Sequence, residues 1–180
     1  MNNRVLGTIA MICAPAILLD IAVTAIGGMI FMVGWVCANI GMWRMRATGT
    51  GKWGRAVLII QLVGLVLAVF ASFFEATRLL GRESTVFNVI QLAWPLSMLW
   101  MLVVGITVIR AKRISDWYRF VPLLCPFWLP IAAIFGTIFG DTTGSVVGYG
   151  YAAVLWGLLG YIVRSNSQQS TLTTPEPTVW

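Results

Sequence analysis

The sequence predicts an all-α integral membrane protein, built as a bundle of six transmembrane helices. Composition is the first observation behind this prediction. Of 180 residues, 59% are hydrophobic and 10% are charged, whereas soluble domains carry about 25% charged residues. The mean hydropathy of +0.88 agrees with this composition. The other two observations are the length of the apolar runs and the uneven distribution of the basic residues.

Four apolar runs are long enough to cross a bilayer, which takes about 20 helical residues. They occupy residues 56–77, 86–109, 120–140 and 145–163. Each of these runs is therefore expected to form one transmembrane helix.

The N-terminal apolar run covers residues 5–43 and is too long for one span. As a single helix it would extend about 58 Å, nearly twice the hydrocarbon thickness of about 30 Å. We predict two spans, at about 5–20 and 25–43, joined by a tight turn within Asp20–Gly28. The alternative is a cleaved signal peptide with Val23-Thr24-Ala25 as its processing site.

The basic residues predict the orientation of the bundle. In the six-span arrangement ten of the twelve Lys and Arg residues fall on one side, and only Arg78 and Arg82 on the other. Because basic loops stay in the cytoplasm, we expect a cell (inner) membrane protein with both termini cytoplasmic and anionic lipid as a partner. Residues 1–164 then form the membrane domain, and the polar residues 165–180 a flexible cytoplasmic tail.

An internal repeat is indicated when the sequence is shifted against itself by 64 residues, which gives six identities over residues 41–61. This predicts a parallel repeat of helix hairpins, in which spans 2 and 3 correspond to spans 4 and 5. The alternative is convergence of two loops on one anchoring pattern. In either case the predicted membrane anchors are Arg46, Trp53 and Arg55 in the first loop and Arg110, Trp117 and Arg119 in the second.

Stripes of small residues predict where the helices approach one another, because helices in lipid associate through such residues. The predicted packing positions are Gly34, Gly41, Gly64, Ala68, Gly144 and Gly148. We expect them to pack within the bundle, with contact to a membrane-protein partner or a second copy of the chain as the alternative.

Glu75 is the first candidate ligand-binding residue. At 100° per residue it falls on the face of its span that also carries Gly64, Ala68 and Ser72. An ionisable side chain on a helix seam in a membrane is costly, which makes it a functional candidate. The alternative is an interfacial carboxylate paired with Arg78, three residues later.

Asn88 and Gln91 share one face of the following span and are predicted to line an outer-half pocket with Glu75 and Asp20. Their side-chain amides could equally serve as hydrogen-bonding bridges between helices. The sequence therefore leaves two interpretations of these residues open.

Prolines predict kinks in two spans. Pro126 and Pro130 lack the N–H that a helix requires, so the fifth span should be kinked and should expose backbone carbonyl groups. Trp94-Pro95 predicts a second kink, in the fourth span. Broken helices can form binding sites in membranes or can serve packing alone.

The sequence contains no histidine, which removes the usual ligand of haem, zinc and copper and the usual general base. We expect no cofactor, metal site, catalytic residue or nucleic-acid partner. The leading hypothesis is a non-catalytic accessory or structural subunit of a membrane complex. The alternative is a small transporter or a ligand- or lipid-binding protein, with its pocket near Glu75, Asn88, Gln91 and the kinked fifth span.

Overall fold

The computed structural model describes residues 2–21, 26–77 and 85–172, with side chains described as far as Asn166 except at residue 76. Within these residues every regular element is a helix. Six helical segments are long and apolar enough to cross a membrane. The predicted all-helical class, and the presence of six helical segments of membrane-spanning length and hydropathy in the described residues, are therefore confirmed.

The six segments follow one another with short connections. Their elements are α1 (Asn3–Cys13) with η1 (Ala14–Ile21); α2 (Ile26–Arg44); α3 (Lys52–Thr77); α4 (Thr85–Gln91) with α5 (Ala93–Ala111); η2 (Asp116–Phe120), α6 (Val121–Leu124), η3 (Cys125–Phe127) and α7 (Trp128–Phe139); and α8 (Asp141–Leu172). The N-terminal apolar run is divided into two helical segments, as predicted.

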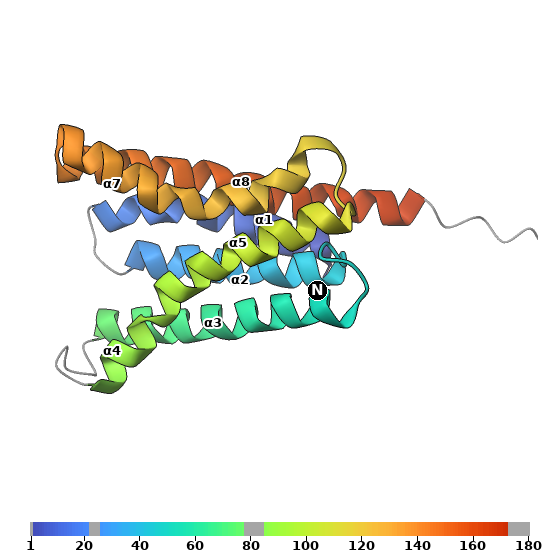
Figure 1. The fold of residues 1–180 in the computed structure, drawn as a ribbon, viewed down its shortest axis with the longest axis horizontal. Coiled ribbons are helices and arrows are strands. Elements are labelled where there is room, and N and C mark those ends of the chain that lie inside the picture. The colour runs from blue at the N-terminus through green and yellow to red at the C-terminus, as the bar shows by residue number, and fades with distance from the viewer. Residues whose placement is uncertain (1, 22–25, 78–84, 173–180) are drawn as a thin grey trace, which may run out of the picture.

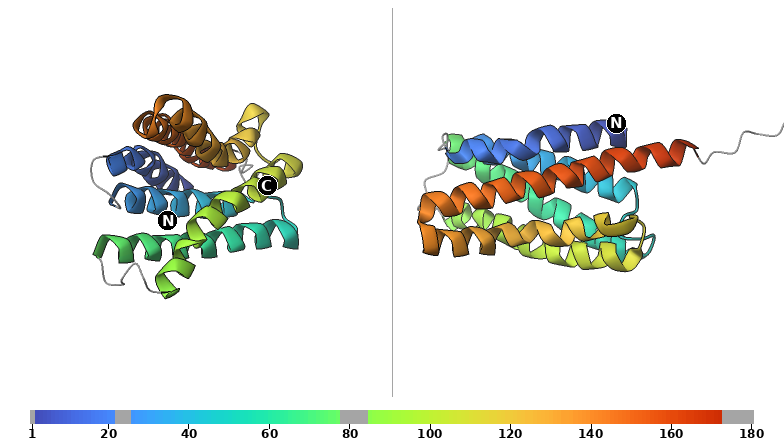
Figure 2. Two further views of the ribbon diagram at one scale, coloured as in Figure 1. Left: turned by 60° about the vertical axis from the view of Figure 1, so that its left-hand side comes forward. Right: turned by 90° about the horizontal axis from the view of Figure 1, so that it is seen from above.

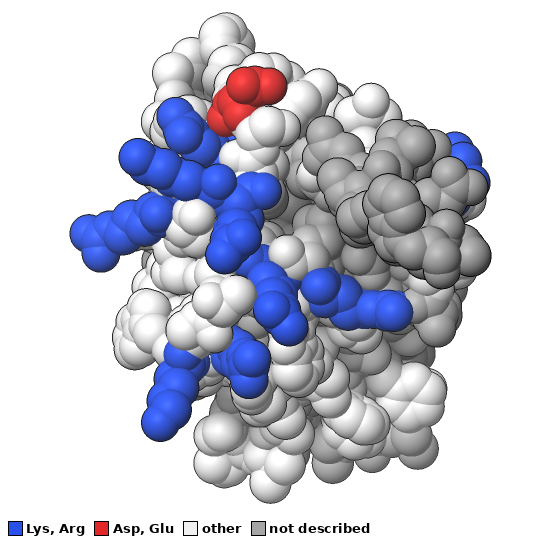
Figure 3. Space-filling view, turned by 90° about the vertical axis from the view of Figure 1, so that its right-hand side faces the viewer, with Lys and Arg blue, Asp and Glu red and all other residues white. Residues whose placement is uncertain are grey.

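The helices lie roughly side by side along the long axis of the molecule, and α5 crosses the bundle obliquely (Figure 1). α8 packs against α1 and α7, while α2 packs between α1 and α3. The first turn of α1 and the last described turn of α8 lie at the end where α2 and α5 finish (Figures 1 and 2). We call this the basic end, because Lys and Arg side chains cover much of its described surface (Figure 3).

Aromatic side chains fill the centre of the bundle between α2 and α8. Trp35 and Trp156 are buried, and their ring centroids lie 5.1 Å apart in an edge-to-face arrangement. Phe31 meets Trp156 in the same way, at 5.2 Å. This cluster sits where α2 faces α8, so it holds the second and sixth spans together through apolar contact.

The fifth span is interrupted where the prolines predict a kink. Pro126 lies in η3, a short 3₁₀ segment between α6 and α7. In this segment the N–H of Trp128 bonds the carbonyl of Cys125, so the carbonyl of Leu124 loses its usual donor. The hydroxyl of Tyr151 on α8 donates to that carbonyl at 3.1 Å. The Tyr151 side chain of α8 therefore supplies the hydrogen bond that the Leu124 carbonyl loses at this interruption.

Pro130 does not break the helix again. It lies in the first turn of α7, which begins at Trp128, and a missing N–H costs little there because first-turn N–H groups have no intrahelical acceptor. The fourth span also breaks, at Leu92 between α4 and α5, just before Trp94-Pro95. Each of these two spans thus has a single interruption beside a tryptophan.

The sixth helix is longer than predicted. It begins at Asp141 and continues to Leu172, beyond the expected end at residue 163 and into the segment expected to be a flexible tail. Side chains at this end bond the preceding turn: the hydroxyl of Ser165 and the amide of Asn166 both donate to the carbonyl of Ile162. Helix propagation adds one backbone bond per residue, so a helix already anchored by packing extends readily into polar sequence.

The predicted packing glycines lie at close approaches between helices of the same chain. A methyl group added at each would collide with a neighbouring span, and the facing residues are Cys13 for Gly34, Val163 for Gly41, Ser97 for Gly64, and Ala132 for both Gly144 and Gly148. Ala68 is likewise buried. A further close approach, between Gly7 on α1 and Gly160 on α8, also lets two backbones meet.

The two loops of the predicted repeat differ in backbone conformation at their aligned arginines. Arg46 has a left-handed φ of 53°, whereas Arg110 lies inside α5 and the left-handed residue is Lys112, with φ of 50°. The internal repeat therefore stays a prediction.

Gly148 and Gly150 provide a matched test of the packing. A methyl group at Gly148 would lie 2.5 Å from the Cβ of Ala132, whereas nothing lies within 4 Å of one at Gly150. We expect Gly148→Ala to lower the free energy of unfolding by about 1–3 kcal/mol. Gly150→Ala should leave it unchanged or raise it by up to about 1 kcal/mol. Thermal unfolding in detergent measures both changes in stability. An equal change in the free energy of unfolding of the two variants would contradict this packing.

Candidate functional site

A cavity of about 260 Å³ lies in the half of the bundle away from the basic end. Each of the six spans contributes to its wall. Among its lining residues are Asp20 of η1, Phe31 of α2, Glu75 of α3, Gln91 of α4, Trp94 of α5, Trp128 of α7 and Tyr149 of α8. The cavity is thus a property of the whole fold and does not belong to one helix pair.

Three aromatic rings form one wall of this cavity. The Trp94 and Trp128 ring centroids lie 5.6 Å apart, and those of Trp128 and Tyr149 lie 5.8 Å apart. The indole N–H of Trp128 donates to the sulfur of Met98, at 3.4 Å, which fixes the orientation of the central ring. The breaks in the fourth and fifth spans occur directly before Trp94 and Trp128, so the proline-associated interruptions position this wall.

Asp20 is in η1, and its carboxylate lies against the first turn of α2. Its Oδ1 accepts a hydrogen bond from the backbone N–H of Gly28, at 2.9 Å. The first N–H groups of a helix have no intrahelical acceptor and carry partial positive charge, so a carboxylate is stabilised there. A methyl group at Gly28 would lie 2.8 Å from the second carboxylate oxygen. Glycine at this position lets the Asp20 carboxylate approach the backbone closely, and Asp20 and Gly28 form a cap contact between spans 1 and 2.

Two of the predicted ligand-binding residues meet at the cavity. Glu75 and Gln91 both line it, together with Ser72 one turn before Glu75. The hydroxyl of Ser72 donates to the carbonyl of Ala68, also a lining residue. Besides the aromatic rings, the lining of the cavity therefore carries carboxylate, amide and hydroxyl oxygens. Arg78, the alternative partner of Glu75, lies outside the described residues.

The other three predicted ligand-binding residues do not line this cavity. Asn88 is exposed on α4, one turn from Gln91, and Pro130 is exposed on α7. Pro126 is buried within η3. The prolines act through the position that they give to Trp128, and the carbonyl group freed beside Pro126 is already bonded by a side chain of α8.

The aromatic wall consists of three residues that are not among the predicted ligand-binding residues, namely Trp94, Trp128 and Tyr149. A signal was available for two of them, because Trp94 directly precedes Pro95 and Trp128 lies between two prolines. No comparable signal marks Tyr149, which reaches the cavity only through the packing of α8 against α7.

The predicted membrane anchors lie at the basic end. Arg46, Arg55 and Arg110 are exposed there, and Trp53 and Trp117 are 65% and 53% exposed. Arg119 is half-buried, and its guanidinium group lies 5.2 Å from the ring centroid of Phe120. The anchors and the cavity therefore occupy opposite halves of the bundle.

In the part of the chain that the structure describes, no group of three or more His, Cys, Asp or Glu side chains is placed to hold a metal ion. The cavity is lined by both oxygen acceptors and aromatic rings, which is a combination suited to binding a small molecule. Comparison with protein-family models, curated proteins and solved structures gives no match.

Asp20 allows a direct test of the cap. Asp20→Ala removes the acceptor of the Gly28 N–H, and we expect a loss of about 1 kcal/mol in the free energy of unfolding. Asp20→Asn keeps a side-chain oxygen at the same position and should lose less. Thermal denaturation of the detergent-solubilised variants measures the order of stability. Two variants as stable as the original chain would rule out this role.

Proposed function

We propose that this chain is a multi-pass membrane protein that binds, and does not chemically transform, a small amphipathic molecule in its outer-half cavity. The ligand has an apolar body, which packs on the three aromatic rings, and a head group that donates hydrogen bonds to the oxygens of Asp20, Glu75 and Gln91. The observation that carries the proposal is the cavity itself, because all six spans converge on it. The fold class also allows a further step, in which the protein transports this ligand across the membrane.

The accessory-subunit hypothesis, which leads from the sequence because it needs no binding site, is less favoured here, because the small residues whose alternative role was contact with a partner face other helices of the same chain. Gly41 packs against Val163, and Gly148 packs against Ala132. Such close approaches hold the bundle together internally, so these stripes are not available to a partner protein or a second copy. The ligand-binding hypothesis needs only residues that the fold already brings together.

The distribution of charge supports an inner-membrane location with both termini in the cytoplasm. The basic end carries Arg44, Arg46, Arg55, Arg110 and Arg113, all exposed. Positively charged loops are retained on the cytoplasmic side during insertion. The cavity then opens in the outer half of the bilayer, where a ligand from outside the cell or from the outer leaflet could reach it.

Gln91 and Asn88 provide a matched pair for the ligand-binding test, since both are exposed on α4 but only Gln91 lines the cavity. The probes are aralkyl amines, such as benzylamine, and carboxylic acids of the same carbon skeleton. We expect the amines to change the tryptophan fluorescence of the purified chain and the acids to bind at least about tenfold more weakly, because the cavity presents carboxylates.

Gln91→Ala should weaken amine binding severalfold, because one hydrogen bond to the head group is lost, and Asn88→Ala should not. Trp94→Ala should also weaken binding of the amines, because it removes part of the apolar wall. Equal binding by all these variants, or saturable binding of none of the probes, would remove the basis for the proposed function.

Two exposed threonines at opposite ends of the bundle test the orientation. Thr50 lies in the connection between α2 and α3, and Thr142 lies in the first turn of α8. In a background with Cys13, Cys37 and Cys125 replaced, we expect Thr50→Cys to react with an impermeant thiol reagent only from the cytoplasmic side. Thr142→Cys should react only from outside, and the reverse pattern would invert the proposed topology.

A further inference from the structure

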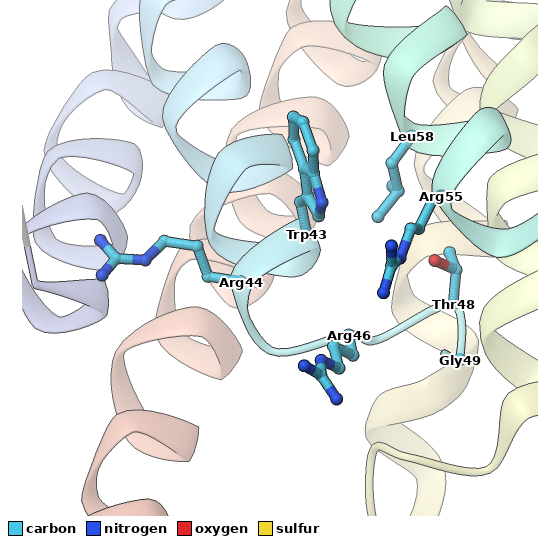
Figure 4. Close-up of a pocket in the computed structure, with 7 residues that line it drawn as sticks. All are labelled: Trp43, Arg44, Arg46, Thr48, Gly49, Arg55 and Leu58. Carbon is cyan, nitrogen blue, oxygen red and sulfur yellow. The ribbon is translucent and has the colours of Figure 1, made fainter. Parts of the chain in front are cut away.

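A second hollow lies at the basic end, between the last turn of α2 and the first turns of α3. Its volume is about 430 Å³, and its walls include Trp43, Arg46, Thr48, Arg55 and Leu58. In Figure 4 the guanidinium group of Arg55 lies between Trp43 and Thr48, with that of Arg46 nearby below the loop. We call this hollow the arginine cleft.

Arg44 also lines the arginine cleft, but its side chain extends to the left in Figure 4, away from Arg55. It also lines a neighbouring hollow that contains Arg113. The charge of the cleft therefore comes from two arginines, one on the loop and one on α3.

The loop that carries Arg46 is held by bonds to its own backbone. The hydroxyl of Thr48 donates to the carbonyl of Gly54 at 2.8 Å, and Thr48 is buried. The N–H of Gly49 donates to the carbonyl of Arg46, also at 2.8 Å. These bonds tie the loop to the first turn of α3, which carries Arg55. The two arginines are thus attached to one rigid unit, so their spacing does not depend on a mobile loop.

Arg46 and Arg55 both line the cleft, and no acidic side chain among its described lining residues neutralises them. Of the four acidic residues whose side chains the structure describes, three belong to the other half of the bundle, and Asp116 is on the connection after α5. Two like charges that approach one another are stabilised by an anion placed between them.

We propose that the arginine cleft is a specific binding site for a phosphate group, held between the guanidinium groups of Arg46 and Arg55. Guanidinium groups match the geometry of phosphate oxygens and bind them through paired, charge-assisted hydrogen bonds. Trp43 is 40% exposed, and it forms an apolar wall with Leu58 beside the charged groups. A phosphate that carries an apolar substituent, as in a phospholipid headgroup, satisfies both walls, whereas a free phosphate satisfies only the charged one.

This site is independent of the outer-half cavity, since the two share no residue and lie in opposite halves of the bundle. It also differs from general attraction of a basic surface to anionic lipid, which depends on total charge and not on particular positions. A pair of double variants with equal loss of charge separates these two cases.

The experiment uses the full chain in detergent and measures retention of phosphatidylglycerol by native mass spectrometry, with phosphatidylcholine as the zwitterionic comparison. The first variant is Arg46→Gln with Arg55→Gln. The control is Arg110→Gln with Lys112→Gln, which removes the same charge from exposed positions at the same end. We expect at least about tenfold weaker retention for the first variant, because charge-assisted bonds are lost, and less than about threefold for the control.

A second arm identifies the source of the phosphate. Competition by millimolar inorganic phosphate or glycerol 3-phosphate, abolished in the cleft variant, would assign the site to soluble phosphates as well. Retention of the lipid that these anions do not displace would assign it to a phospholipid headgroup. Equal losses in the two double variants, unchanged retention in the cleft variant, or binding of none of the phosphate probes would overturn the proposal.

Discussion

Where a helix switches to a 3₁₀ segment, a backbone carbonyl can lose its usual N–H donor, and in an apolar bundle that carbonyl needs another donor. Here the hydroxyl of Tyr151 supplies it at the carbonyl of Leu124. That bond ties α8 to the break in the fifth span, and α7 restarts at Trp128 directly after it. The hydrogen bond between Tyr151 and the Leu124 carbonyl therefore helps to set the position of Trp128, and with it the contact between Trp128 and Trp94. The aromatic wall of the cavity follows from this constraint.

The bundle offers opposite chemistry at its two ends. The outer-half cavity presents oxygen acceptors, among them the carboxylates of Asp20 and Glu75, whereas the arginine cleft presents the donors of Arg46 and Arg55. A molecule suited to one site is repelled by the other, because their charges are opposite in sign. In the proposed orientation the same asymmetry inserts the protein one way, so the cleft lies level with the anionic headgroups of the inner leaflet.

Helix number and approximate bounds could be predicted because apolar length decides them. The cavity could be predicted only in part. Glu75 was identified because a carboxylate on a seam is costly, and it does line the cavity. Asn88 and Gln91 were assigned to one face by a uniform 100° per residue, but only Gln91 lines the cavity, just before the break at Leu92. Tyr149 could not be found, since nothing in its local sequence records which spans α8 will touch.

The predicted repeat bears on why only one loop forms an arginine cleft. Under the alignment Arg46 corresponds to Arg110, yet the left-handed residue that ends the helix is Arg46 in one loop and Lys112 in the other. α5 ends at Ala111, three residues beyond the position that aligns with the end of α2 at Arg44, so Arg110 lies within the helix while Arg46 lies in a loop. Similar sequence therefore produces two different surfaces. If the hairpins share an ancestor, this shift of the helix end accounts for the difference between the proposed phosphate site in one copy and the predicted membrane anchor in the other.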